Sequence, residues 1–529
     1  MTVVPALATI CGCAFAFFLY RLNKSNEPIN THFPPGPRGW LWSILGNIKD
    51  LSVDPSILHM HFASWRHVYG DVIGLKVLGR SIIVLNSRTA IHDLLDERSV
   101  IYSDRPSFPF LTELAQLDWM LPILTYGPEM HRQHRMLNQC INTSFFHQFQ
   151  KLLANEARVF ALSVGKDPKT MDAALNRMAG SSILGFTLGN HEPEKKEMLL
   201  KLAYDFDESM SVDAAVGTHP VDLIPALAKL PLFVFGKKLA DGMKRLNHCV
   251  TDMLEIPYQL TKDTMEMSAV GPSMMRHLIE TYQDQDGTVS NERSIQASVA
   301  IAFSGGAMTT VITLQVFLLA MMRYPEVQKK AQAYIDGVVG NERLPILSDR
   351  EAIPYIEAIA KEISRWRPVV PMSFPHTNMR DDVYNGMFIP KGSTIIPNTC
   401  QSGHDIYGLC LHDENDFPEP NEFRPERFTD GYKLFKDIPD PRNFAFGYGR
   451  RICPGRHFAE SNLWMNIATL LSVYNIRYPV DVNGLGQKQD PKFIWNLALL
   501  KPEEFECHFE PRSKERLEKL RIAVEEGSY

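Results

Sequence analysis

One segment, from Ala297 to Met322, constrains the fold most strongly because it contains no charged residue. An uncharged α-helix of this length could cross a membrane. A helix without a polar face can equally be a core helix that other elements cover on every side. Small and polar residues interrupt the segment, which favours the core helix; they are Ser304, Gly305, Gly306, Thr309, Thr310, Thr313 and Gln315. The segment therefore predicts the central buried helix of a large helical protein.

The rest of the sequence predicts helices around this segment and short strands in two regions. β-Branched runs at 71–75 and 81–86 predict the first strands. Mostly helical sequence then extends from Thr89 to about residue 365, and short strands and turns return at 368–397. We expect a mostly α-helical fold with a small β region. The clearest helical patterns outside the central segment are 146–164 and 326–338.

The composition argues against several other classes of protein. Of the 529 residues, 45% are hydrophobic, which is enough to bury a large core. The net charge of −6 is spread without long runs, so no nucleic-acid-binding surface is predicted. The eight cysteines form no Cys-x-x-Cys pair, which argues against a zinc site or a thioredoxin-like motif. Their scatter indicates free thiols in a reducing compartment.

The N-terminal segment is predicted to be a membrane anchor. Residues 3–20 are uncharged and mostly apolar, and a helix of this length spans roughly 27 Å, close to the thickness of a bilayer core. Arg21 and Lys24 follow at once, which favours a cytosolic position for the downstream chain. A cleaved secretory signal is the alternative, but no charged residue precedes the apolar run.

A stiff, proline-rich strap, Pro34 to Arg38, separates this anchor from the globular part. No internal repeat or second linker follows. The sequence therefore predicts one globular domain between an anchor and a charged tail. The expected boundaries are 1–24 for the anchor, 25–40 for the strap, 41–510 for the domain and 511–529 for the tail.

The strongest chemical motif surrounds Cys453. Two glycines precede it, and they permit an irregular loop with positive φ. Nearby arginines and a following helix N-terminus would favour a thiolate over a thiol. The full motif reads Phe446-Gly447-Tyr448-Gly449-Arg450-Arg451-Ile452-Cys453-Pro454-Gly455, followed by Arg456. A lone cysteine could be an incidental residue of a surface turn, but this ten-residue motif argues against that alternative.

This string resembles the heme-binding loop of the cytochrome P450 family, and the resemblance covers residues 34 to about 510. It implies that Cys453 is the axial thiolate ligand of the iron of heme b. It also implies that three further loop residues contribute to the cofactor site: Phe446, Gly447 and Gly455.

Two further segments resemble the same family in the same order along the chain. Glu362 and Arg365 stand at i, i+3 on a predicted helix. The sequence Phe423-Arg424-Pro425-Glu426-Arg427-Phe428 follows about sixty residues later. The resemblance implies a buried ion network of Glu362, Arg365 and Arg427. A solvated helix face is the alternative for the first pair alone.

Within the central helix, residues 305–310 resemble the family's oxygen-activation motif. The resemblance implies that the glycines let the helix open beside the heme, and that Thr309, with Thr310, serves proton delivery when the O–O bond of dioxygen splits. The chain departs from the family at Met308, where an acid is usual. The alternative is that the threonines only bond back to their own helix.

The resemblance also implies cationic partners for the heme propionates. They are Arg451, two residues before the cysteine, and His376. A third partner comes from the helix that follows Tyr126, where His134 and Arg135 both stand at or beside the basic position. A second departure is the segment 403–410, which resembles an insertion.

The function implied is a monooxygenase that inserts one oxygen atom of O₂ into an apolar small molecule. Electrons would come from NADPH through a separate reductase, since the chain has no flavin or nicotinamide motif. The closest likeness is to fungal microsomal enzymes of natural-product pathways, terpenoid or aromatic. This implies one span in the endoplasmic reticulum membrane, contact with lipid and a cytosolic catalytic domain.

Two other classes of function stay open at this point. A heme-thiolate isomerase or peroxygenase would need no reductase, and Met308 slightly favours it. A non-catalytic heme-binding protein would carry the same loop. The expected substrate-pocket segments, 106–124 and 222–235, are mostly apolar and do not specify the substrate.

Overall fold

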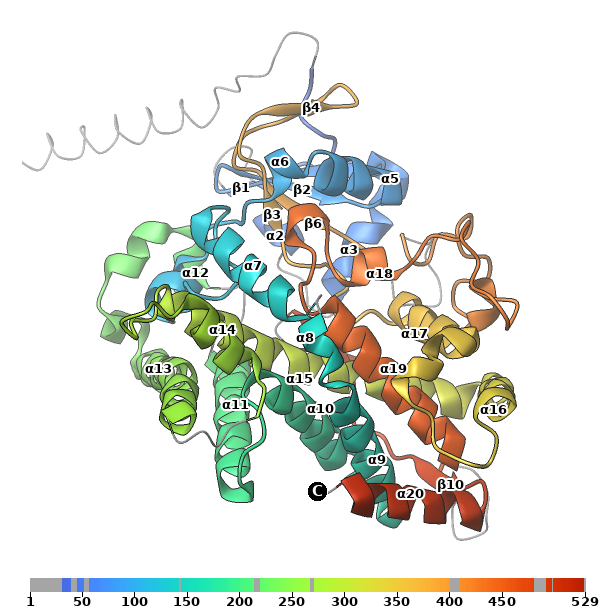
Figure 1. Cartoon of the computed structure of the whole chain (residues 1–529). Coiled ribbons are helices and arrows are strands. Elements are labelled where there is room, and N and C mark those ends of the chain that lie inside the picture. Colours follow the sequence, from blue (N-terminus) through green and yellow to red (C-terminus); the bar gives the residue numbers. More distant parts are fainter. Residues whose placement is uncertain are drawn as a thin grey trace, which may run out of the picture. The chain divides into compact units, whose positions relative to one another are not determined.

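The computed structural model describes residues 31–39, 45–51, 57–141, 144–213, 219–266, 271–399, 410–479, 491–496 and 498–527. The predicted anchor at 1–24, much of the strap at 25–40 and nearly all of the segment 403–410 lie outside these residues. The described chain is mostly helical with small sheets, as predicted (Figure 1). It forms two compact units: unit 1 is drawn from Met1–Pro106, Met372–Asp413 and Tyr448–Arg451, and unit 2 from Ser107–Pro371, Glu414–Gly447 and Ile452–Tyr529. The domain boundaries predicted from the sequence stay predictions.

Unit 1 is built around a four-stranded sheet in the order β1-β2-β6-β3. Strands β1 (Val72–Val77) and β2 (Arg80–Leu85) form an antiparallel hairpin, which confirms the strands predicted at 71–75 and 81–86. Positive φ at Leu78 and Gly79 gives the tight turn between them. Strand β6 (Thr394–Pro397) pairs in parallel with β2 and antiparallel with β3 (His376–Thr377). The sheet thus places His376 at its edge.

Short helices and a second hairpin complete unit 1. The hairpin joins β4 (Asp382–Tyr384) to β5 (Met387–Ile389). A small apolar core packs on the four-stranded sheet and contains Phe62, Ile73, Leu75 and Val84. The helical elements are α2 (Ile48–Leu51), α3 (Leu58–Ser64), α4 (Arg66–Tyr69), α5 (Arg88–Ile91), the π-helical η2 (His92–Glu97) and α6 (Ser99–Tyr102).

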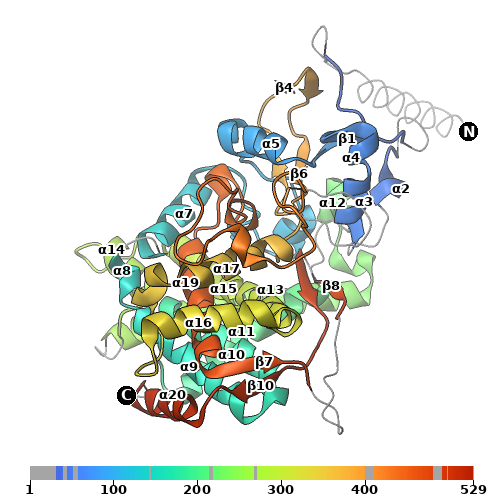
Figure 2. The same ribbon diagram turned by 90° about the vertical axis from the view of Figure 1, so that its right-hand side faces the viewer.

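Unit 2 is organised around α15 (Glu292–Arg323), which confirms the predicted central helix. It is the one helix in the described chain that is long and apolar enough to cross a membrane, and 67% of that apolar window is buried. Most of its side chains belong to the main hydrophobic core. Figures 1 and 2 both show it running beside α10 (Met171–Thr187), with α9 (Gln150–Lys166) beyond. Burial on several sides accounts for its lack of charge.

The other helices of unit 2 surround this core. Helix α16 (Pro325–Val339) confirms the prediction at 326–338. The remaining helices are α7 (Pro128–Ile141), α8 (Ser144–His147), α11 (Pro193–Asp213), α12 (Pro220–Leu223), α13 (Lys237–Glu266), α14 (Met274–Tyr282), α17 (Pro354–Trp366), α18 (Arg442–Ala445), α19 (Arg456–Val473) and α20 (Lys514–Gly527). Two-stranded sheets pair β7 (Tyr474–Arg477) with β10 (His508–Pro511) and β8 (Phe493–Asn496) with β9 (Leu499–Pro502).

The single helix predicted at 146–164 is wrong at its beginning. Helix α8 ends at His147, and α9 begins at Gln150. The turn between them accompanies the packing of two buried rings against Phe186: the centroid of Phe146 lies 6.1 Å and that of Phe149 5.0 Å from it. Apolar packing thus interrupts a segment with good helical periodicity.

Candidate active site

The chain turns back on itself before Cys453, so that Phe446 and Cys453, both in unit 2, are hydrogen-bonded to each other. The backbone N–H of Cys453 donates a hydrogen bond of 2.7 Å to the carbonyl of Phe446. Gly447 begins the turn with a φ of 79°. The guanidinium of Arg456 lies 5.7 Å from the centre of the Phe446 ring, and Gly455 precedes helix α19. The loop therefore presents an exposed cysteine sulfur just before a helix N-terminus.

The protonation of Cys453 differs from the expectation based on its neighbours. Desolvation by the surrounding protein raises the pKa of the thiol, although the amide of Gly455 and the charge of Arg456 lower it. The charge of Arg456 thus acts in the predicted direction, but desolvation outweighs it in the protein without a bound metal. A bound metal ion deprotonates a coordinating thiol. The cysteine would thus become a thiolate as it binds iron.

The segment before Cys453 requires a glycine at position 449, within unit 1. The backbone N–H of Gly449 donates to Asp96 Oδ1 at 2.7 Å. Its φ is 49°, and a Cβ added there would lie 2.3 Å from the carbonyl oxygen of Leu95. Arg451 follows and is buried, with its Nε donating to the carbonyl of Ser103 at 2.7 Å. The glycine thus lets the chain pass close to Leu95 and directs Arg451 inward.

Arg451 belongs to a group of buried basic residues in unit 1, together with His376 and Arg105. His376 Nδ1 donates to the carbonyl of Tyr102 at 2.7 Å. One terminal nitrogen of Arg105 donates to the carbonyls of Phe374 at 2.8 Å and Pro375 at 2.7 Å. The buried Nε of Arg105 has no hydrogen-bond partner. We call Arg105, His376 and Arg451 the basic cluster.

Burial and mutual repulsion disfavour positive charge in the basic cluster. Burial and the charge of Arg451 lower the pKa of Arg105 well below its usual value. Burial and the charge of Arg105 do the same to the pKa of His376. Such a concentration of buried positive charge is costly without a partner. The carboxylates of a heme would supply that partner, and an exposed cysteine stands two residues after Arg451, so the residues present fit a heme.

Sequence reasoning identified His376 and Arg451 but missed Arg105. The available signal was an arginine followed by a proline just before an apolar stretch, in Asp104-Arg105-Pro106. Such a tripeptide also occurs in ordinary turns. Only burial to 7% exposure, with an unpartnered Nε, distinguishes Arg105 from a surface arginine.

Helix α15 carries the predicted threonines and is continuous through its glycines. Thr309 Oγ1 donates to the carbonyl of Gly305 at 2.9 Å, and Thr310 Oγ1 donates to that of Gly306 at 2.8 Å. The expectation that the glycines open the helix is wrong for this structure. The two glycines act differently: a Cβ at Gly306 would lie 2.7 Å from Ile183, whereas one at Gly305 would meet open space. Gly305 therefore leaves room beside Thr309.

The two candidate basic residues of α7 lie in different environments. His134 Nε2 donates to the carbonyl of Ile452 at 3.0 Å, and its Nδ1 accepts from Asn138 at 2.9 Å. Arg135 is exposed. His134 thus holds the residue before Cys453 in place through its backbone. A propionate contact for either residue stays a prediction.

The Glu362 network is compact, and its central pair is fully buried. Arg365 donates from Nε at 2.7 Å and from a terminal nitrogen at 2.8 Å to the two oxygens of Glu362. Arg427 Nε donates to Glu362 at 3.3 Å, and the backbone N–H of Arg424 donates at 2.7 Å. Glu362 and Arg365 are both 0% exposed. The structure therefore brings together the three residues that the sequence grouped, within unit 2.

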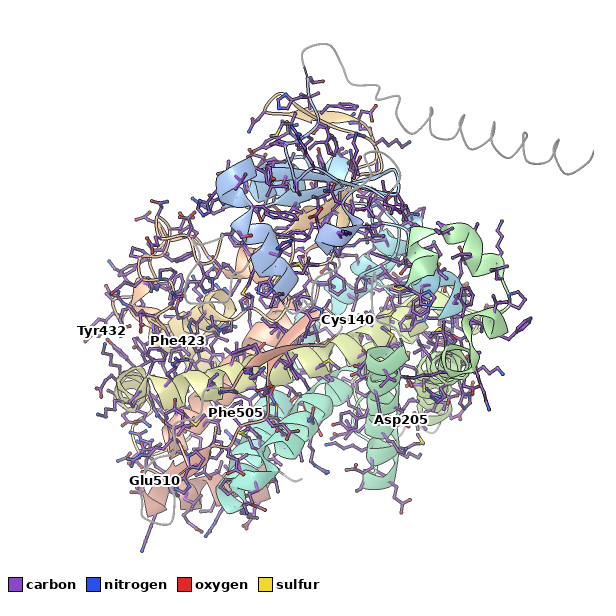
Figure 3. The ribbon with its side chains drawn as sticks, turned by 180° about the vertical axis from the view of Figure 1, so that it is seen from behind. Cys140, Asp205, Phe423, Tyr432, Phe505 and Glu510 are labelled. Carbon is purple, nitrogen blue, oxygen red and sulfur yellow. The ribbon has the colours of Figure 1, made fainter. Side chains whose placement is uncertain are left out.

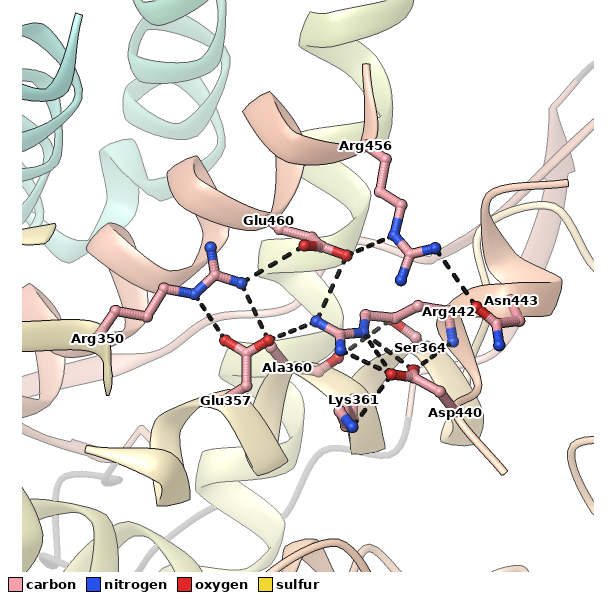
Figure 4. Close-up of polar contacts among 10 residues, drawn as sticks. All are labelled: Arg350, Glu357, Ala360, Lys361, Ser364, Asp440, Arg442, Asn443, Arg456 and Glu460. Atoms are coloured by element: carbon pink, nitrogen blue, oxygen red, sulfur yellow. Dashed lines mark hydrogen bonds and ion pairs between the residues drawn. The ribbon is translucent and has the colours of Figure 1, made fainter. Parts of the chain in front are cut away.

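A second ion network, which the sequence did not reveal, connects α17, α18 and α19 (Figure 4). Glu460, on the first turns of α19, accepts from Arg456 Nε at 2.8 Å and lies 3.4 Å from Arg442. The network thus positions Arg456 beside the Cys453 loop. Its charged members are Arg350, Glu357, Lys361, Asp440, Arg442, Arg456 and Glu460.

The segment predicted to line the substrate pocket, 106–124, is largely buried in unit 2. It contains the π-helical turn η3 (Phe110–Leu114). The N–H of Phe110 donates a hydrogen bond of 3.0 Å to Asp222, in the second predicted pocket segment, 222–235. Beyond Asp222, several apolar side chains are instead exposed: Ile224, Leu230, Phe233 and Val234.

Comparison with known proteins agrees with this arrangement. The family model described as Cytochrome P450 matches residues 34–508. Cytochrome P450 monooxygenase 226 of Postia placenta is 35% identical over 91% of this chain and 89% of its own length. Cytochrome P450 monooxygenase COX1 of Coprinopsis cinerea is 33% identical over 97% of both chains. Monooxygenase claR of Ampulloclitocybe clavipes is 33% identical over 98% of this chain and 94% of its own. The chain therefore belongs to the cytochrome P450 family, whose members are heme-binding oxidoreductases that use molecular oxygen.

Proposed function

We propose that this protein is a heme-thiolate monooxygenase in which Cys453 is the axial ligand of heme b, and that it oxidises an apolar small molecule. The observation that carries the proposal is the buried Nε of Arg105, which has no hydrogen-bond partner in the described part of the chain and lies in the basic cluster beside His376 and Arg451. Arg451 is two residues before an exposed cysteine in the sequence, so one cofactor with an iron and carboxylates would satisfy both features.

In this proposal the chain's own residues divide the work. Cys453 Sγ would hold the iron, and Arg105, His376 and Arg451 would hold the heme carboxylates. When bound, the heme supplies the redox chemistry that activates dioxygen. Thr309 holds a proton at its Oγ1, next to the space left by Gly305. The Glu460 network keeps Arg456 close to the cysteine loop.

The neutral state of His376 has a consequence for heme binding. Its Nδ1 already donates to Tyr102, so Nε2 can donate to a carboxylate only when the ring is protonated. The low pKa of this histidine indicates that the ring is neutral without heme. Heme binding is therefore expected to take up a proton at His376.

Electrons would come from NADPH through a separate reductase, because the sequence has no nucleotide-binding motif of its own. Residues 3–20 would anchor the chain in the endoplasmic reticulum membrane, with the catalytic domain in the cytosol. The relatives described above are fungal monooxygenases by name, which supports a fungal monooxygenase. A role in secondary metabolism, on a terpenoid or aromatic substrate, is part of our proposal.

Co-expression with a fungal reductase tests this function. Membranes containing the protein are supplied with NADPH and a panel of terpenoid and aromatic compounds under ¹⁸O₂. We expect a product heavier by one labelled oxygen atom that depends on both NADPH and the reductase. Oxygen transfer that requires only added peroxide, or isomerisation without added oxygen, would instead indicate a peroxygenase or an isomerase. Heme binding without any product or substrate-induced spectral change would contradict an enzymatic role.

A further inference from the structure

The central helix lacks the acid that its oxygen-activation motif usually contains, because position 308 is a methionine. A carboxyl from another helix reaches the same face of α15. Asp207, on α11, accepts a hydrogen bond of 2.8 Å at Oδ1 from the Oγ of Ser304. Ser304 and Met308 are four residues apart, so their side chains lie on one face, one turn from each other. Asp207 therefore meets α15 one turn before the missing acid.

The surroundings of Asp207 suit proton exchange near neutral pH. Its side chain is half-buried, and Ser304 is 9% exposed. Burial raises the pKa of Asp207 to about 7, although the hydrogen bond from Ser304 lowers it. The neighbouring titratable group on α11 is Tyr204, whose pKa is raised by burial and, more weakly, by Glu197 and Asp207. The protonated and the ionised form of Asp207 are therefore both well populated at physiological pH.

Asp205, on the same helix, provides a contrast (Figure 3). It is exposed and forms an ion pair of 3.2 Å with Lys201. Its printed partner is on its own helix, one turn away, whereas the partner of Asp207 is on α15. The two aspartates are therefore a matched pair, with one turned to the central helix.

Ser304 is close in the helix to Gly305 and Thr309. Ser304 directly precedes Gly305, and the carbonyl of Gly305 accepts the hydrogen bond of Thr309. No side chain fills the space beside Gly305. A proton that leaves Ser304 on the side away from Asp207 would thus enter the region beside Thr309.

We propose that Asp207 replaces the missing acid as a proton-relay residue, acting through Ser304 on the proton supply of Thr309. This rests on the proposed monooxygenase function. The Ser304 hydroxyl, which donates to the carboxylate form of Asp207, turns away when Asp207 is protonated, so that the carboxyl O–H donates to Ser304 Oγ. The carboxyl proton then moves to Ser304 Oγ as the original hydroxyl proton of Ser304 leaves on the other side. The resulting carboxylate takes a new proton from solvent, so the relay is restored without any net change. Asp207 is a positioning residue in this scheme, because it acts through Ser304.

A first experiment measures the carboxyl itself and needs no turnover. Infrared difference spectra of the full-length protein are recorded between pH 5 and pH 9. We expect one protonated-carboxyl band that disappears with a midpoint of about pH 7. Asp207→Asn should remove this band, and Asp205→Asn should leave it unchanged. A band that survives Asp207→Asn, or no band near neutral pH, would overturn the proposal.

A second experiment separates a relay from a structural tie between α11 and α15. Asparagine keeps an oxygen that accepts from Ser304, so Asp207→Asn preserves the tie and removes the proton. We expect normal heme content and melting temperature but a fall in product per NADPH of at least about tenfold, since a positioned proton donor typically contributes ~10²–10⁴-fold. Hydrogen peroxide should increase correspondingly. Loss of heme from this variant, or unchanged coupling, would show that Asp207 is structural only.

The decisive variant restores an acid at the usual place. Met308→Asp, introduced into the Asp207→Asn protein, should recover most of the lost coupling, and a pH profile set by the new carboxyl should replace the original one. Ser304→Ala should uncouple the enzyme as Asp207→Asn does. Failure of Met308→Asp to restore coupling in a protein with normal heme content would contradict the relay. If the unaltered protein gives no NADPH-dependent product, the monooxygenase proposal fails, and the infrared titration still tests Asp207.

Discussion

Two buried arginines of this protein have opposite surroundings. Arg365, in unit 2, donates to both oxygens of Glu362 and to the backbone carbonyls of Pro420 and Glu422. Arg105, in unit 1, reaches two carbonyls with one nitrogen, and its Nε has no partner. The chain itself satisfies the first charge and leaves the second incomplete. Buried polar groups are normally satisfied, so an incomplete one indicates a ligand. We therefore propose that the first arginine serves the fold and the second the cofactor.

The largest expected effect follows from breaking the satisfied network. Glu362→Ala leaves two buried guanidinium groups without a carboxylate, which costs roughly 3–5 kcal/mol. We expect misfolded, heme-free protein, measured by heme content and by urea unfolding of the soluble fraction. The matched control is Glu326→Ala, which removes an exposed i, i+3 pair with Lys329 on α16. That change should leave both measurements almost unaltered. Normal heme content in Glu362→Ala would show that the network does not support the fold.

Removing Arg105 should weaken heme binding without destabilising the fold, the reverse of what is expected for Glu362→Ala. Arg105→Gln removes a buried charge that Arg451 repels, so the heme-free protein should keep or gain stability. Heme should leave about 10- to 100-fold faster, because a hydrogen bond to a charged group contributes about 1.5–3 kcal/mol. Stopped-flow transfer of heme to a scavenging globin measures this rate. An unchanged rate, or a large loss of stability without heme, would place Arg105 with Arg365 as a structural residue.

These two arginines also show what could be predicted from the sequence. Glu362, Arg365 and Arg427 lie in short motifs with fixed spacing, so a resemblance was sufficient to group them. The Cys453 loop was predictable for the same reason, and so were β1, β2 and α15, whose patterns extend over many residues. Arg105, Asp207 and Glu460 could not be found in this way, because what distinguishes them is burial and partners from distant segments. The pKa of Cys453 shows the same limit, since the charge of Arg456 was visible in the sequence and the opposing desolvation was not.

A smaller effect concerns His376 in the protein without heme. Its folded pKa is lowered, so the folded state keeps the ring neutral while the unfolded chain takes up a proton below about pH 6.5. The stability that this histidine contributes is present above that pH and is lost as the pH falls. Between pH 7 and 5.5 the loss is about 1 kcal/mol. In urea unfolding, the free energy of unfolding of His376→Gln should fall between pH 7 and 5.5 by about 1 kcal/mol less than that of the unaltered protein. The control His67→Gln, at an exposed site, should show the same fall as the unaltered protein. Identical acid dependence in all three would contradict the buried neutral state.

The smallest effect is expected at Arg135, which is exposed on α7. Arg135→Gln should change the heme-transfer rate by less than about twofold, because an exposed charge is well screened. A loss comparable to that of Arg105→Gln would instead make Arg135 a propionate partner.

The identity of the iron ligand is the central claim, and Cys453→Ala tests it most directly. Spectra of the reduced protein with carbon monoxide are compared for the unaltered chain, Cys453→Ala and Cys249→Ala, the last being a half-buried cysteine on α13. We predict that the strongly red-shifted Soret band of thiolate ligation is present in the unaltered and Cys249→Ala proteins and absent from Cys453→Ala. Survival of that band in Cys453→Ala would contradict the account.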